Sequence, residues 1–160
     1  MVEATILSAL RAVFAELVDG SGDEPVGGLN AHDPGLLRSL DRLTAAQASA
    51  VPPSGGASIA AHVDHLRYGL EISTRWNAGE GPDADFAASW KRTTVSESEW
   101  AERRAALARE VRAWGEALKN PRNPTDVTAM AGVVGAVVHL AYHMGAIRQI
   151  DRSARGPGAE

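Results

Sequence analysis

The stretch from residue 127 to residue 147 contains no Asp, Glu, Lys or Arg. Its length approaches that of a membrane-spanning helix, which needs about 20 apolar residues. It also contains two histidines, Tyr142, Thr128 and three glycines, which argue against a lipid-facing helix. A central helix that is buried on most sides within a helical protein has the same composition. We therefore expect residues 127–147 to form a core helix and not a membrane span.

The length and composition of the chain indicate one globular domain. Its 160 residues are close to the size of an average single domain, about 150 residues. Hydrophobic residues make up 44% and charged residues 22%, which is typical of a folded protein and excludes a disordered chain. The β-branched runs separated by turns that an all-β protein requires are missing. We therefore expect an all-α fold.

The charged residues and the absence of cysteine exclude several kinds of binding partner and metal ligand. The formal net charge is −4 and the basic residues are scattered, so a surface that binds nucleic acid is not expected. There is no cysteine, which excludes disulfides, a thiolate metal site and a cysteine nucleophile. Any metal ion must therefore be held by nitrogen and oxygen ligands. Because residues 1–18 show no basic leader or cleavage pattern, we expect a cytoplasmic protein.

Apolar residues recur at helical spacing in four long segments. These segments predict helices over residues 2–18, over residues 57–78, from residue 96 to a break at residues 120–124, and over residues 128–151. A shorter helix is expected after an N-cap at Asp33, with Pro34 at its first position. Thr44 and Gln47 form a capping box that indicates one further helical turn.

Two of the connections between these helices are long. Residues 20–33 contain four glycines, which indicates a surface loop. Residues 79–95 separate the second long helix from the next one, which begins with a capping box at Ser96. A connection of this length is typical of a crossover along a bundle. The sequence therefore predicts a four-helix bundle with long crossover connections over residues 1–152, followed by a flexible tail over residues 153–160.

His139 and His143 stand at positions i and i+4 of the last predicted helix, so both imidazoles lie on one face about one turn apart. Neutral ring nitrogens at this spacing can bind one metal ion at about 2.0–2.1 Å. The alternative is a pair of buried histidines with a purely structural role. Burying two imidazoles among Val, Ala, Gly and Leu costs desolvation free energy that a structural role does not require. This cost favours the metal site.

The second long helix contributes two further histidines, His62 and His65, whose spacing of three lets either ring reach the interior. One of them would complete a set of three imidazoles, which leaves coordination positions open for water or substrate. The spacing alone does not distinguish between the two. The fifth histidine, His32, lies in the predicted loop before Pro34 and is expected to be a surface turn residue.

Two segments resemble the DinB/YfiT-like family of metalloenzymes. They are residues 58–66, Ser-Ile-Ala-Ala-His-Val-Asp-His-Leu, and residues 139–149, which begin His-Leu-Ala-Tyr-His. The resemblance implies a four-helix bundle that holds a divalent metal ion on one histidine of the second helix and two of the last. The family's Ser-Ile pair, five further residues and His-Leu imply His65 as the first ligand, with His139 and His143 as the other two.

Residues near these ligands have several interpretations. His62, one turn before the first ligand, is a partner of a ligand, a general base or a core residue. Tyr142 precedes a ligand and could bring its hydroxyl to the site. We treat His62 and Tyr142 as candidate catalytic residues. Asp64 is expected to lie on the polar face as a partner of Arg67 or Arg75.

A divalent ion on three imidazoles acts as a Lewis acid and lowers the pKa of a coordinated water or thiol toward neutrality. The first hypothesis is therefore a metal-dependent enzyme acting on a small-molecule substrate, and zinc, nickel, manganese and iron all suit the ligands. The resemblance implies transferase or isomerase chemistry with a low-molecular-weight thiol, and hydrolysis is the other candidate reaction. The second hypothesis is a non-catalytic metal-binding or structural bundle that acts in a stress response. Either protein could be a homodimer, because helices rich in Ala and Gly pack closely against a second copy.

Overall fold

The computed structural model describes residues 2–158, and this part of the chain is all-helical and contains no strand. The long helices are α1 (Val2–Asp19), α4 (Ile59–Ala78), α5 (Glu97–Ala117) and α6 (Val127–Ile150). The short elements are α2 (Gly35–Asp41), α3 (Ala45–Ser49) and the 3-10 turns η1 (Ala88–Trp90) and η2 (Arg152–Ala154). The predicted all-α class is confirmed, and the ends of the long helices agree with the sequence to within a few residues.

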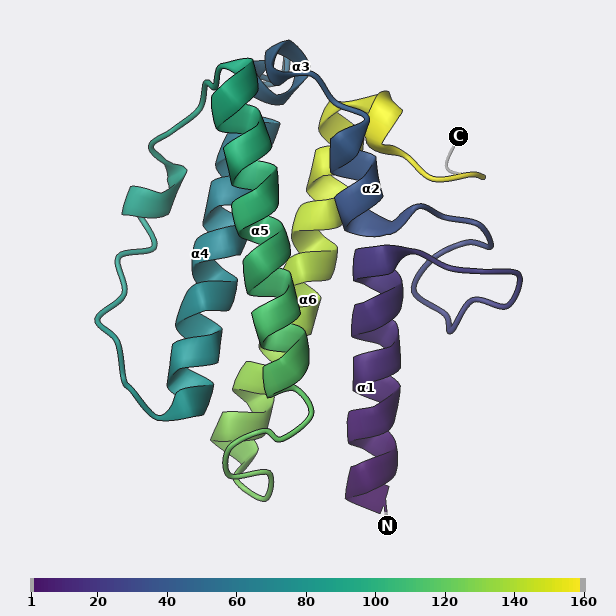
Figure 1. The fold of residues 1–160 in the computed structure, drawn as a ribbon, viewed down its shortest axis with the longest axis vertical. Coiled ribbons are helices and arrows are strands. Elements are labelled where there is room, and N and C mark those ends of the chain that lie inside the picture. The colour runs from purple at the N-terminus through teal and green to yellow at the C-terminus, as the bar shows by residue number, and fades with distance from the viewer. Residues whose placement is uncertain (1, 159–160) are drawn as a thin grey trace.

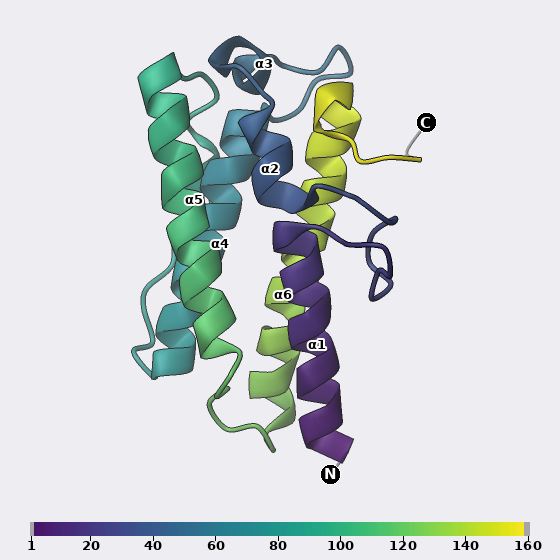
Figure 2. The same cartoon turned by 45° about the vertical axis from the view of Figure 1, so that its right-hand side comes forward.

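The four long helices lie side by side (Figures 1 and 2). α4 packs against α5 and α6, and α1 packs against α5, α6 and α2. α4 and α5 run in the same direction, so the segment between them, residues 79–96, returns along the length of α4 and carries η1 on the way (Figure 1). We call this segment the crossover. This return places η1 against α4, which matters for the site described below.

Side-chain caps begin the helices where the sequence predicts them. Ser96 and Thr44 both form the expected capping boxes, with Glu99 and Gln47 respectively. The prediction for α2 is wrong by one residue, because the helix begins at Gly35 and Pro34 is its cap. The Asp33 carboxylate still accepts a hydrogen bond from the Gly35 amide at 2.8 Å.

The core is formed by the apolar faces of all four long helices. The predicted stripe of α5 is fully buried, and its members are Trp100, Leu107, Val111, Trp114 and Leu118. The Trp100 indole also donates a hydrogen bond to the Leu43 carbonyl at 2.8 Å, which ties α5 to the chain after α2. The heptad-like spacing of the stripe was therefore sufficient to identify the inward face of α5.

The connection over residues 20–33 is held by one buried carboxylate. Glu16 of α1 accepts hydrogen bonds from the backbone amides of Val26, Gly28 and Leu29, the last two at 2.7 and 2.9 Å. Burial acts to raise the pKa of Glu16, but the amide donors outweigh it, and the pKa lies below its ordinary value. This loop is therefore fastened to the end of α1 by a charged group.

The expectation that residues 127–147 are buried on most sides is wrong. Only 39% of the most apolar 18-residue window of α6 is buried. Val127, Val134, Val138 and Tyr142 are exposed, by 83, 42, 60 and 66% respectively. By length and composition α6 could cross a membrane, but a helix of a folded core meets the same criteria, and α6 packs against α4 and α1. One face of α6 is thus apolar without being covered.

Among the described residues, two largely buried ion pairs join segments that are distant in sequence. Arg148 of α6 donates two hydrogen bonds to the Asp33 carboxylate, at 2.6 and 2.9 Å. Asp64 of α4 pairs with Arg103 of α5 at 2.7 Å, so the expected pairing with Arg67 or Arg75 is wrong. Asp64 pairs with Arg103 because its side chain faces α5. The Arg103 side chain is only 8% exposed there.

The chain after α6 turns through η2, in which Ala154 is buried. Asn30 donates a hydrogen bond to the Pro157 carbonyl at 3.0 Å, so this segment contacts the loop before α2. Residues 159–160 of the expected tail lie outside the described part of the chain. The flexibility of residues 153–160 stays a prediction.

We expect the Arg148→Met substitution to destabilise the protein by about 3–5 kcal/mol, because it leaves the Asp33 carboxylate buried without its cation. Urea unfolding followed by tryptophan fluorescence measures this change. Arg112→Met is the matched control. Arg112 donates two similar hydrogen bonds to the Asp19 carboxylate, but both side chains are about half exposed. Its cost should stay below about 1 kcal/mol. Equal losses in the two variants would contradict the role assigned to the buried pair.

Candidate metal centre

Three imidazole rings from two helices meet between α4 and α6. The Nε2 atom of His139 lies 3.2 Å from Nε2 of His65 and 2.8 Å from Nε2 of His143. The ligand-capable nitrogen atoms of the three rings all lie within 4.8 Å of one another. The structure therefore brings together the three residues that the sequence and the resemblance select, although their role as ligands stays a prediction.

The helices position these rings by simple geometry. His139 and His143 are one turn apart on α6 and project from one face. On α4, Gly69 lies opposite His139, and a Cβ atom at this position would approach the His139 ring to 3.1 Å. The glycine therefore lets α4 and α6 come close enough for His65 to reach the pair on α6.

A serine of the crossover orients the His65 ring. Ser89 Oγ lies 2.7 Å from His65 Nδ1 and donates its own hydrogen bond to the Phe86 carbonyl, also at 2.7 Å. Because the hydroxyl proton is used in that bond, the serine accepts from His65, which places the ring proton on Nδ1. The lone pair of His65 then lies on Nε2 and points toward the other two rings. Trp90 stacks on His65 with ring centroids 4.1 Å apart and covers one of its faces.

Sequence reasoning did not identify Ser89 and Trp90 as parts of the centre. They belong to η1, which is separated from His65 by the end of α4 and a long connection. The signal that was available is an aromatic pair, Phe86 and Trp90, within an otherwise polar connection. Aromatic residues in a long loop pack onto the domain, but the sequence does not say where.

His62 is hydrogen-bonded to one of the three rings. Its Nδ1 atom lies 2.8 Å from Nδ1 of His143, and its ring is nearly perpendicular to the Trp90 ring, with the centroids 5.3 Å apart. If Nε2 of His143 is to bind a metal ion, its Nδ1 must carry the proton and donate it to His62. His62 then carries its own proton on Nε2, where it is a donor and not a base. This geometry favours the first interpretation of His62, a residue that orients a ligand.

The spacing and the tautomers of the rings suit one divalent ion. Nitrogen atoms that bind a tetrahedral ion at about 2.05 Å lie about 3.3 Å apart, and the observed separations are 2.8 and 3.2 Å. With the protons of His65 and His143 on Nδ1, two lone pairs face the Nε2 atom of His139. A cation at their meeting point would satisfy these lone pairs, and without a cation a proton on Nε2 of His139 can do so by hydrogen bonds to His143 and His65.

The electrostatic setting keeps the rings neutral. Burial and, to a smaller extent, repulsion from the neighbouring imidazoles together lower the pKa of His65 to about 4 and that of His143 to about 3. Burial also lowers the pKa of His62 and of His139. Since only the neutral imidazole binds a metal ion, the four rings are in the competent form at pH 7.

Tyr142 and His32 do not belong to the group of three histidines whose Nε2 atoms converge. Tyr142 is exposed, and its ring is nearly perpendicular to the His143 ring, with the centroids 5.1 Å apart. Its catalytic role stays a prediction. His32 is an exposed turn residue with a φ of 62° beside Asp23, as expected. The structure therefore separates His32 and Tyr142 from the three converging nitrogen atoms.

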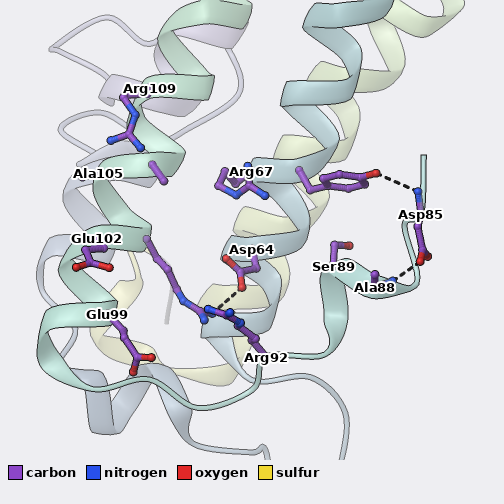
Figure 3. A pocket seen from close by; sticks show the side chains of 13 residues that line it. Asp64, Arg67, Asp85, Ala88, Ser89, Arg92, Glu99, Glu102, Ala105 and Arg109 are labelled. Carbon is purple, nitrogen blue, oxygen red and sulfur yellow. Dashed lines mark hydrogen bonds and ion pairs between the residues drawn. The ribbon is translucent and has the colours of Figure 1, made fainter. Parts of the chain in front are cut away.

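A charged cleft of about 710 Å³ lies between α4, α5 and the crossover and includes Ser89 in its wall (Figure 3). Its lining carries four arginines and four carboxylates, namely Arg67, Arg92, Arg103, Arg109, Asp64, Asp85, Glu99 and Glu102. Asp85 fixes the crossover at this point, because its amide donates to the Tyr68 hydroxyl and its carboxylate accepts from the Ala88 amide (Figure 3). Ser89 is thus shared between the cleft and the cluster of histidines.

The fold and the site define an all-helical protein with three converging histidines that can hold a metal ion. The sequence model of the DinB superfamily matches residues 29–147, which include all of these histidines. The chain therefore belongs to the DinB superfamily. No curated protein and no solved structure gives a match.

We expect Ser89→Ala to weaken metal binding by about 10- to 100-fold, because the His65 ring loses the partner that fixes its tautomer. Competition titration with a chromophoric chelator measures the dissociation constant. Ser98→Ala, at an exposed serine bonded only to the Ser96 hydroxyl, should leave it unchanged. An unchanged affinity in Ser89→Ala would show that the hydrogen bond does not orient the ring.

We expect the metal-free protein to lose stability as the pH falls below about 6.5. The unfolded chain protonates its histidines near that value, whereas the pKa of His65 and of His143 is held at about 4 and about 3 in the fold. The unfolded state then binds more protons, so the free energy of unfolding falls by up to about 1.4 kcal/mol per pH unit for each ring. Urea titrations at pH 7, 6 and 5 with a chelator present measure the slope, which should shrink in the double variant His65→Gln, His143→Gln.

Proposed function

We propose that this protein is a divalent-metal-dependent enzyme acting on a small molecule, and that its four long helices form a four-helix bundle around the metal centre. The supporting observation is the convergence of the Nε2 atoms of His65, His139 and His143. The Nδ1 atoms of two of these rings are already anchored, by Ser89 and by His62. Anchored rings present their lone pairs before an ion arrives, which lowers the cost of binding it.

In this proposal the metal ion supplies the chemistry, and the residues of the chain orient its ligands and control access to it. A bound divalent ion, of zinc, nickel, manganese or iron, supplies Lewis-acid chemistry and lowers the pKa of a coordinated water or thiol. Ser89 and His62 hold the rings of His65 and His143 in their ligand tautomers. Trp90 excludes water from one face of His65. His139 is only half-buried, which leaves an approach to the centre from solvent.

The charged cleft supports a polar substrate. It borders the centre at Ser89, which contacts His65 at Nδ1, away from the converging Nε2 atoms. Its arginines and carboxylates, of which Arg103 and Asp64 pair with each other, suit a small molecule that carries both signs of charge. A low-molecular-weight thiol with amino and carboxyl groups has this character. We therefore favour thiol-dependent transferase or isomerase chemistry, with hydrolysis as the other reaction that such a centre supports.

A second candidate function is a non-catalytic metal-binding module. The observation in its favour is the composition of the group that could hold a metal within the described residues, which is three histidines without a carboxylate. In addition, His62 is a donor in its expected tautomer, so the cluster offers no evident general base. A stress-response role, a cytoplasmic location and the absence of nucleic acid and membrane partners stay predictions for both candidates.

The proposal predicts one tightly bound ion per chain and metal-dependent turnover. Elemental analysis compares the wild type, the double variant His139→Ala, His143→Ala and the control His32→Ala, which removes an exposed imidazole. The wild type and the control should retain the ion, and the double variant should lose it. The reaction of 1-chloro-2,4-dinitrobenzene with cysteine tests thiol transfer, and p-nitrophenyl acetate without thiol tests hydrolysis.

The outcomes separate the two candidates. Rates that require the metal and fall to background in the double variant support an enzyme. A metal-loaded protein that raises neither rate but melts at a higher temperature than the metal-free form supports the module. Equal metal content in the wild type and the double variant would remove both, because the three histidines would then not be the ligands.

A further inference from the structure

The uncovered face of α6 is a regular stripe. Its residues follow one another at spacings of 4, 3, 4, 4, 3 and 4 along the helix, and all of them are exposed: Val127, Ala131, Val134, Val138, Tyr142, Gly145 and Gln149. The stripe is about 33 Å long at 1.5 Å per residue. It carries no charged side chain, and a Cβ atom at Gly145 would meet nothing within 4 Å. Exposed apolar surface of this extent marks a contact with another molecule.

The stripe is symmetric about Val138. If a second α6 is laid against it in the opposite direction with the two Val138 side chains facing, the spacings coincide. Ala131 then faces Gly145 of the second copy, and Val134 faces Tyr142. In these two pairs a small residue opposes a small one and a large residue a large one, which is the self-complementarity that a two-fold interface requires. At the ends of the stripe, Val127 faces the polar Gln149. A parallel arrangement does not use this symmetry.

We propose that the stripe is the interface of a homodimer in which two α6 helices pack antiparallel across a two-fold axis at Val138. Charges at the ends of the helix agree with this direction. Asp126 caps the start of α6, and the other end carries Asp151 as its cap, followed by Arg152. The antiparallel arrangement brings Asp126 of each helix toward Arg152 of the other. The partner is a second copy of this chain, and the proposal does not depend on the metal.

The mass of the protein in solution tests the proposal first. Sedimentation equilibrium at micromolar concentration should give twice the chain mass of 16.8 kDa for the wild type. Val138→Glu places two carboxylates against each other at the axis and should give the monomer mass. Val26→Glu is the matched control, because Val26 is exposed to a similar degree, 56% against 60%, but lies in the loop after α1. It should remain a dimer, and circular dichroism checks that both variants fold.

Disulfide trapping tests the axis and the direction, since the chain has no cysteine of its own. Helices packed 8–10 Å apart bring facing Cα atoms to within disulfide reach. Val138→Cys should therefore form a covalent dimer on oxidation. Val134→Cys should not, because the antiparallel arrangement separates the two copies of residue 134 by about 12 Å along the axis. Mixing Ala131→Cys with Gly145→Cys should again give a covalent dimer.

Three results would overturn the proposal. The first is a monomeric wild type, including one that binds phosphatidylcholine vesicles through α6 instead of a second copy. The second is a Val138→Glu variant that folds and remains dimeric. The third is equal trapping at residues 134 and 138, which indicates a parallel pair.

Discussion

Four imidazole rings packed against one another inside a helical protein are the constraint on which the rest of the site depends. Each ring must stay neutral, because burial and the neighbouring rings lower the pKa of His65 and of His143. Neutral rings still have one donor and one acceptor each, and these must be matched. Ser89 and His62 match two Nδ1 atoms, which leaves the Nε2 atoms facing one another. A proton on Nε2 of His139 can satisfy these facing lone pairs by hydrogen bonds, and a shared cation would satisfy them as well, so one arrangement of rings suits the metal-free and the metal-bound protein.

The hydrogen-bonding needs of the four rings explain features of the fold that apolar packing alone does not require. The connection from α4 to α5 returns along α4, and in doing so it brings Ser89 and Trp90 to His65. Gly69 removes the side chain that would keep α4 from His139. The crossover is thus part of the site, because it contributes the hydrogen bond that orients the first histidine.

Local signals in the sequence were sufficient for the helices and for the pair His139 and His143, whereas the choice of His65 over His62 came from the family resemblance. The capping boxes at Thr44 and Ser96 and the α5 stripe depend on residues three or four apart, and the structure confirms them. Contacts between distant segments were beyond this reasoning. Asp64 has arginines at helical spacing on α4 but pairs with Arg103 of α5. Ser89 reaches His65 through a chain reversal that no local pattern encodes.

The uncharged stretch of α6 misled the prediction for a physical reason. Absence of charge was interpreted as burial within one chain, but the helix has two faces that exclude charge on different grounds. One face packs against α4 and carries His139 and His143, two of the three histidines that could hold an ion. The opposite face, centred on Val138, is exposed and suits a second copy of the chain. Because His139 lies next to Val138, a partner helix on the outer face would border the half-buried side of the metal centre, so the interface and the site would share one wall.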